Sequence, residues 1–276
     1  MESLRTPNFD ALGVMGDTHG DTLWVMMGIE NFAKRGITHI LHLGDFGVWP
    51  GVSGEKYLRK VNLELKTHGM LMVVTLGNHE NYVRMAKAVP SKLMEGFQQL
   101  VGYDHIVFPA RGQHWNWNGV EFCSLGGANS IDRFNRTPYI DWWPEESISL
   151  GDVYRTAENG PADIMLTHDC PSGVPILSTL THHSENGGWS PEALTYADES
   201  RMMLRQAVDI VQPELLLHGH YHVYADFQVE LNILGTEDSY SMRSVCFDKE
   251  YTDSNMAILY PQTRELSTYS EWPILD

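Results

Sequence analysis

Side chains that can bind a metal follow five separate short apolar segments of this sequence. They are Asp17 and His19 in GDTHG, Asp45 in LGDFG, Asn78 and His79 in LGNHE, His168 in LTHDC, and His220 and His222 in HGHYH. The set offers oxygen and imidazole donors and no thiolate, a mixture that suits Mn, Fe, Zn or Co better than Ca or Mg alone. A single such residue after a strand is usually a cap or another satisfied polar group. Five such places in one chain indicate a metal site.

Short apolar runs alternate with longer amphipathic segments, which is typical of an α/β fold. The pattern predicts strands at residues 11–15, 39–43, 70–76, 163–166 and 214–217, and helices at residues 22–34, 56–66, 81–94 and 191–211. Residues 106–125 predict paired strands around an Asn118-Gly119 turn, and so a second sheet, while residues 244–260 are weakly strand-like. Ligands of open α/β sheets bind beyond the carboxyl ends of the strands, where these polar residues would collect.

Composition and charge narrow the class of protein and of ligand. The chain is 42% hydrophobic and 20% charged, as globular proteins are, and we expect a single domain over residues 1–276. Its formal net charge of −17 disfavours extended nucleic acid, whereas bound cations could still attract a small phosphate. Three widely spaced cysteines predict reduced thiols. The sequence lacks a signal-like start and a bilayer-spanning run, so we expect a cytoplasmic protein without membrane contact.

The five motifs, in this order, resemble those of the calcineurin-like metallophosphoesterase family, and they extend from Gly16 to His222. The segment GGANSID with the Trp pair that follows it is similar to a bacterial and phage subset of these enzymes. The resemblance implies a four-layer α/β/β/α sandwich with two divalent metal ions at the strand ends. Mn is the metal we expect, with Fe, Zn, Ni or Co as alternatives.

The resemblance also implies a role for each motif residue. Asp17, His19 and His222 would hold the first metal, Asn78, His168 and His220 the second, and Asp45 would bridge them. A hydroxide between the two metals would attack phosphorus. His79 would face the substrate and stabilise or protonate the leaving group, with a purely structural role as the alternative. For His218 and Asp169 we expect a structural role or the orientation of a ligand imidazole.

The segment between the third and fourth motifs offers candidates for substrate binding. Arg133 and Arg136 could bind phosphate, and Trp142 and Trp143 could stack on a nucleobase. Alternatively, the tryptophans cover a sheet edge and Arg133 pairs with Glu145 or Glu146.

Departures from better-known relatives narrow the expected activity. The second motif reads GDFGVWPG rather than the GDxVDRG of protein Ser/Thr phosphatases, and the chain also lacks the GNHD typical of many cyclic-nucleotide relatives. We therefore expect a phosphodiesterase that acts on small nucleotides, cyclic ones among them. A phosphomonoesterase or a nuclease of the same fold is the alternative, and a non-catalytic scaffold is disfavoured because no ligand is missing.

Overall fold

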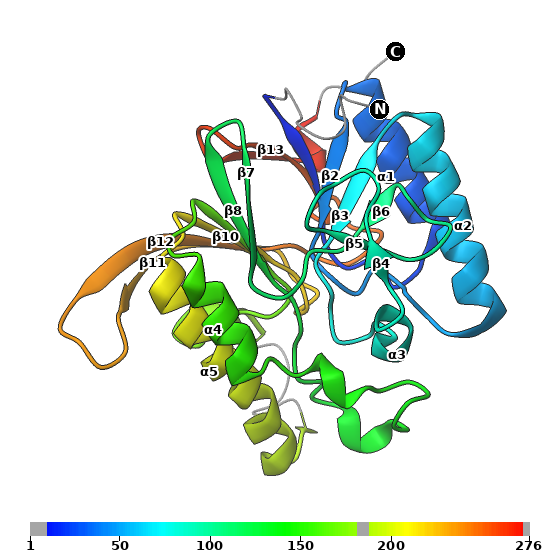
Figure 1. The fold of residues 1–276 in the computed structure, drawn as a ribbon. Coiled ribbons are helices and arrows are strands. Elements are labelled where there is room, and N and C mark those ends of the chain that lie inside the picture. Colours follow the sequence, from blue (N-terminus) through cyan, green and yellow to red (C-terminus); the bar gives the residue numbers. More distant parts are fainter. Residues whose placement is uncertain (1–9, 181–187, 273–276) are drawn as a thin grey trace.

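The computed structural model describes residues 10–180 and 188–272, in which two six-stranded sheets lie face to face (Figure 1). The first sheet has the strand order β14 (Glu265–Thr268), β13 (Met256–Tyr260), β1 (Leu12–Met15), β2 (His39–His42), β3 (Leu71–Val74) and β6 (Ile106–Val107). Strands β1, β2, β3 and β6 run parallel, and β13 joins β1 in the antiparallel direction. The carboxyl ends of β1, β2 and β3 therefore open onto the same edge of this sheet.

The second sheet has the order β11 (Ala225–Asn232), β12 (Ser239–Cys246), β10 (Leu215–His218), β9 (Ile164–Thr167), β8 (Val120–Leu125) and β7 (Gln113–Trp117). Strands β8, β9, β10 and β12 are parallel, and β7 forms a hairpin with β8. The hairpin turn lies at Asn118-Gly119, where both residues adopt positive φ, as the sequence predicts.

Helices cover the outer face of each sheet. Helices α1 (Thr22–Lys34) and α2 (Gly51–Thr67) cover the first sheet, and α4 (Leu150–Glu158) and α5 (Pro191–Val211) cover the second (Figure 1). Asp21 caps α1 by accepting the Trp24 N–H, and Ser190 caps α5 in the same way. The apolar stripe of α1 then points inward, with Val25, Ile29 and Phe32 fully buried.

Three apolar cores hold these layers together. Alternate residues of β1 show the division, because Leu12 and Val14 pack between the sheets while Met15 packs towards α1. Leu166 of β9 and Leu217 of β10 meet them from the second sheet. The predicted α/β/β/α sandwich is confirmed. No helix among the described residues is both long and apolar enough to cross a membrane.

The predicted helix at residues 81–94 is wrong. A single turn, α3 (Tyr82–Met85), is followed by β4 (Val89–Pro90), which pairs with β5 (Gln98–Gln99). Pro90 cannot continue a helix, and it also moves Val89 out of the helical conformation. Strand β6 joins the first sheet instead of pairing within the hairpin segment, and α4, β11 and β14 are elements that the sequence reading did not predict.

Candidate active site

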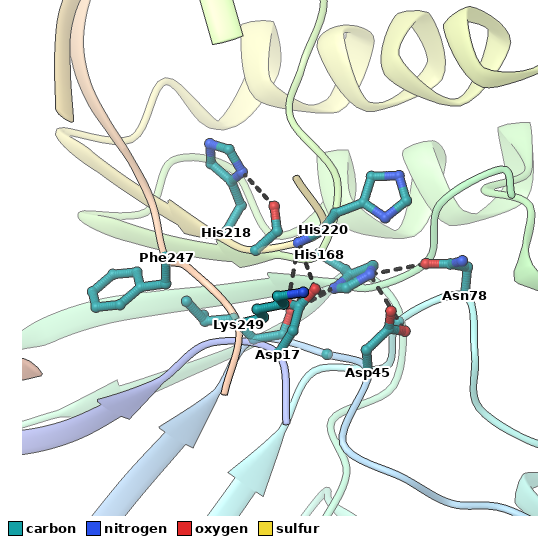
Figure 2. Close-up of polar contacts among 12 residues, drawn as sticks. Asp17, Asp45, Asn78, His168, His218, His220, Phe247 and Lys249 are labelled. Atoms are coloured by element: carbon teal, nitrogen blue, oxygen red, sulfur yellow. Dashed lines mark hydrogen bonds and ion pairs between the residues drawn. The ribbon is translucent and has the colours of Figure 1, made fainter. Parts of the chain in front are cut away.

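The predicted metal ligands from all five motifs meet where strands of both sheets end. The loops after β1, β2 and β3 bring Asp17, Asp45 and Asn78 from one sheet, and the loops after β9 and β10 bring His168 and His220 from the other. Figure 2 shows Asp17, Asp45, Asn78 and His168 turned towards one another. The packing of one sheet on the other thus brings together residues that are more than a hundred positions apart in the sequence.

His168 lies at the centre of one group of ligands. Its Nε2 is 2.9 Å from Asn78 Oδ1 and 3.4 Å from Asp45 Oδ1, and its ring packs on the ring of His220 at 4.9 Å between centroids. The Nδ1–H donates to the carbonyl oxygen of Leu43 at 2.8 Å. Because this bond keeps a proton on Nδ1, Nε2 is the nitrogen that faces the carboxylate and amide oxygens and that would bind a metal once its own proton is lost.

A second group forms around Asp17. The donor atoms of Asp17, His19 and His222 all lie within 4.8 Å of one another, and His222 Nε2 is 3.3 Å from Asp17 Oδ2. Asp45 lies between the two groups, since its Oδ2 is 3.6 Å from His19 Nε2 while its Oδ1 faces His168. One carboxylate therefore presents an oxygen to each group, which is the arrangement that a shared ligand of two cations needs.

The backbone around these ligands is tightly folded. His19, Asp45, His220 and His222 have φ values of 43°, 49°, 73° and 52°. Non-glycine residues rarely adopt this left-handed region, and such conformations concentrate at functional sites. Gly44 has a φ of 103°, and a Cβ there would collide with the His168 ring. Gly44 thus leaves the space that the ring of His168, which comes from the second sheet, occupies.

The electrostatics of the site fit divalent cations. Asp17 and Asp45 are 0% and 2% exposed, and burying two carboxylates together is unfavourable unless positive charge compensates them. Burial disfavours the charged imidazole of His168, yet Asp45 and Asp17 outweigh it and raise its pKa to about 10. Burial likewise opposes the charged form of His19, but Asp45 and Asp17 raise its pKa to about 9. The metal-free site thus holds protons where cations would bind.

This gives a testable pH dependence. At pH 7, below both raised pKa values, His19 and His168 are protonated in the metal-free protein, and a metal ion can bind only the neutral imidazoles. We expect Mn²⁺ uptake to release up to about two protons at pH 7, and the release to fall as pH rises through 9 to 10. Calorimetry in buffers of different ionisation enthalpy measures this, and binding heats that do not depend on the buffer at pH 7 would contradict it.

Glu250 is a residue of the site that sequence reading missed. Its Oε2 is 2.8 Å from His19 Nδ1, so the carboxylate orients this ring and leaves Nε2 towards Asp45. It comes from the loop between β12 and β13, where Asn255 also donates to the backbone oxygen of Asp17. Neither residue belongs to a motif, and only the antiparallel pairing of β13 with β1 brings this loop to the metal ligands.

His79 lies beside the bridging carboxylate. Its backbone N–H donates to Asp45 Oδ1 at 2.9 Å, and its Nε2 is 3.8 Å from Asp45 Oδ2. Arg136 Nη1 is 3.0 Å from His79 Nδ1, and Asp132 holds the same guanidinium through Nε at 2.7 Å. Burial is the main reason that the pKa of His79 is lowered, and Arg136 adds to this effect while Asp45 opposes it. Arg136 thus lies against His79, next to the predicted metal ligands.

The other candidates in this segment point elsewhere. The Arg133 guanidinium lies over the ring of Tyr196 at 3.4 Å and lines a separate hollow, and it forms no ion pair with Glu145 or Glu146 within the described residues. Trp142 donates from its ring nitrogen to Glu146, and Trp143 is buried. The structure therefore places Arg136, but not Arg133 or the two tryptophans, beside the metal ligands.

The two remaining predicted residues lie outside the ligand groups. His218 is fully buried at the end of β10 and turns away from the ligands (Figure 2), and burial lowers its pKa to about 4. Asp169 accepts hydrogen bonds from the Tyr221 hydroxyl and the Cys170 N–H. His218 is in a structural position, and Asp169 orients Tyr221 rather than a ligand imidazole.

A cleft of about 750 Å³ opens beside the ligands. Its lining includes five residues of the motifs, namely Asp45, Asn78, His79, His220 and His222. Its walls carry the apolar side chains Ile131, Leu177, Trp189, Leu194 and Val223 together with the charged groups Asp132, Asp169, Asp198, Arg201 and Lys249. This volume lies within the range of sites for small ligands, and a concave apolar wall next to a few polar groups is typical of them.

Comparison with known proteins agrees with this geometry. A sequence model described as calcineurin-like phosphoesterase matches residues 11–224, which include every predicted metal ligand. The chain belongs to the calcineurin-like phosphoesterase family. It is accordingly a metal-dependent phosphoester hydrolase, and the family assignment made from the motifs is confirmed. No curated protein sequence matches the chain significantly.

Solved structures show the same fold at low sequence identity. The protein TT1561 of Thermus thermophilus is 13% identical with a TM-score of 0.53, over 94% of this chain and 97% of that chain. A dimetal phosphatase from Danio rerio is 11% identical with a TM-score of 0.52, over 91% and 92%. At such identities the likeness supports the calcineurin-like fold alone.

Proposed function

We propose that this calcineurin-like protein is a phosphodiesterase that hydrolyses small nucleotide diesters, cyclic ones included, with two Mn²⁺ ions. Asp17, His19 and His222 would hold one ion and Asn78, His168 and His220 the other, while Asp45 would contact both. Bound there, two divalent cations would polarise the phosphate oxygens and activate the attacking water. Binding and orienting the substrate would fall to the side chains that line the cleft.

The charge of the cleft is the observation that carries the choice of a diester. Its arginine Arg201 is paired with Asp198 at 3.2 Å, and the neighbouring Arg136 is paired with Asp132 at 2.7 Å. A phosphodiester carries one negative charge, whereas a monoester carries between 1.5 and 2 near neutral pH, roughly as a phosphorylated side chain does. Acids thus neutralise both arginines, and among the described residues Lys249 is the remaining lysine or arginine of the cleft, so we expect the less charged ester to be favoured.

The apolar wall supports a nucleotide as the group attached to the phosphate. Trp189 and Leu177 are 38% and 50% exposed, and both line the cleft that contains His79. A nucleobase can lie against such a surface, while the acidic protein as a whole repels long polyanions. We therefore expect a mononucleotide-sized substrate rather than extended nucleic acid.

A panel of natural substrates tests the proposal. Protein stripped of metal and reloaded with Mn²⁺ is offered 2′,3′-cyclic and 3′,5′-cyclic nucleotides, the matching mononucleotides and a single-stranded oligonucleotide. We expect faster turnover of the cyclic diesters than of the monoesters or the oligonucleotide. Turnover of monoesters alone would identify a phosphatase, preference for the oligonucleotide a nuclease, and no turnover of any compound a scaffold.

A further inference from the structure

Glu146 is a buried carboxylate close to the metal ligands, in the segment between the third and fourth motifs. Its side chain is 0% exposed and accepts four hydrogen bonds. The donors are the Ser130 N–H at 2.7 Å, the Ser130 hydroxyl at 2.5 Å, the Trp142 ring nitrogen at 2.8 Å and the Tyr196 hydroxyl at 3.1 Å. These donors stabilise the ionised carboxylate, although burial outweighs them and raises the pKa of Glu146 to about 7.

Ser130 connects this carboxylate to a metal ligand. Its Oγ accepts a hydrogen bond from Asn78 Nδ2 at 2.9 Å. A hydroxyl has one proton, and the ionised Glu146 accepts it, so only the lone pairs of Ser130 Oγ face Asn78. The Asn78 NH₂ must then point at Ser130, which leaves Oδ1 pointing at His168 Nε2, 2.9 Å away.

The orientation of this amide decides whether Asn78 can bind a cation. Its oxygen is a metal donor, whereas its NH₂ group has no lone pair available for a metal. A rotation of 180° about the last side-chain bond exchanges the two with almost no change in shape. A neighbour that accepts but does not donate is therefore needed to hold the productive orientation.

We propose that Glu146 is a positioning residue for the second metal ion, because it fixes through Ser130 the orientation of the Asn78 amide. The inference rests on the metal assignment in the proposed function but not on the substrate. Arg111 keeps Glu146 in place independently of any metal, since its guanidinium donates to the backbone oxygens of Glu145, Glu146 and Ser147. The carboxylate is thus part of the folded scaffold before a cation arrives.

Two substitutions separate this role from a general role in folding. In Glu146→Gln the new NH₂ can donate to Ser130 Oγ, which frees the hydroxyl proton to donate to Asn78 Oδ1 and so favours the rotated amide. In Ser130→Ala the link to Asn78 is removed, while the backbone N–H at position 130 can still donate to Glu146. Glu145→Gln is the matched control, because that side chain is exposed and only its backbone oxygen accepts from Arg111.

The experiment compares the wild type and the three variants after metal removal. Calorimetric titration with Mn²⁺ measures both sites, the visible spectrum with Co²⁺ reports the ligands, and thermal unfolding of the metal-free protein reports folding. We expect Glu146→Gln and Ser130→Ala each to weaken one of the two sites by about 10- to 100-fold and to change the Co²⁺ spectrum. Glu145→Gln should match the wild type.

Wild-type affinity at both sites and an unchanged spectrum in folded Ser130→Ala would overturn the inference, even if Glu146→Gln failed to fold. Weakened binding in the variants of a protein that hydrolyses no diester would support the positioning role and reject the proposed substrate. A wild-type protein that binds no metal would reject both.

Discussion

Replacement of Asp45 by alanine will lower the turnover of phosphodiesters by roughly 10³-fold or more. Asp45 is the side chain that presents one oxygen towards His19 and the other towards His168, so its removal takes a ligand from both groups. Two adjacent cations without a shared anion repel each other, and the loss of one cation removes several kcal/mol of transition-state stabilisation.

The measurement pairs steady-state rates with bound metal. We expect Asp45→Ala to bind at most one Mn²⁺ tightly, whereas Asp238→Ala, an exposed carboxylate in the hairpin between β11 and β12, should behave as the wild type does. An Asp45→Ala protein that keeps two tight Mn²⁺ ions and most of its activity would show that Asp45 does not bridge the metals.

Replacement of His79 by alanine will lower kcat by about 10²- to 10⁴-fold while both metals stay bound. His79 lines the cleft and lies next to Asp45 without belonging to either group of ligands. A proton donor matters most when the departing oxygen is strongly basic. We therefore expect a larger loss with a nucleoside leaving group than with an aryl leaving group.

The rates of His79→Ala on a cyclic nucleotide and on a bis-aryl phosphate check this expectation. His68→Ala, an exposed histidine just after α2, is the control. An equal loss on both substrates would assign His79 to positioning or electrostatic stabilisation rather than to proton donation. Wild-type activity of His79→Ala would show that His79 has only a structural role.

Most of the candidate metal site could be predicted because its proposed ligands lie just after buried strands. Strands such as β1 and β3 are continuous apolar runs, and a glycine followed at once by the polar residue comes directly after β1 and three residues after β3. Parallel strands place their carboxyl ends on one edge of the sheet. The proximity of Asp17, Asp45 and Asn78 could therefore be predicted from the strand that precedes each of them. The capped helix that starts at Pro191 was equally local and was found at its correct limits.

The parts that sequence reasoning missed depend on contacts between distant segments. Glu250 reaches His19 across 231 residues, and no spacing rule connects them. The sequence offered Glu146 only as a possible ion-pair partner of Arg133, and only the fold surrounds it with four donors. Arg133 was a reasonable phosphate ligand by residue type, but the position of Tyr196 on α5 determines where its guanidinium lies.

The most direct test of the two-metal phosphodiesterase is a Mn²⁺ titration of activity on bis-aryl and mono-aryl phosphates that share one leaving group. The shared leaving group removes differences in leaving-group basicity, so the ratio of the two kcat/KM values, each divided by the uncatalysed rate of that ester, reports which ester the site prefers. We expect activity to reach its full value at two bound Mn²⁺ per chain, with the diester cleaved faster. Full activity at one metal or none, or faster cleavage of the monoester, would contradict this account.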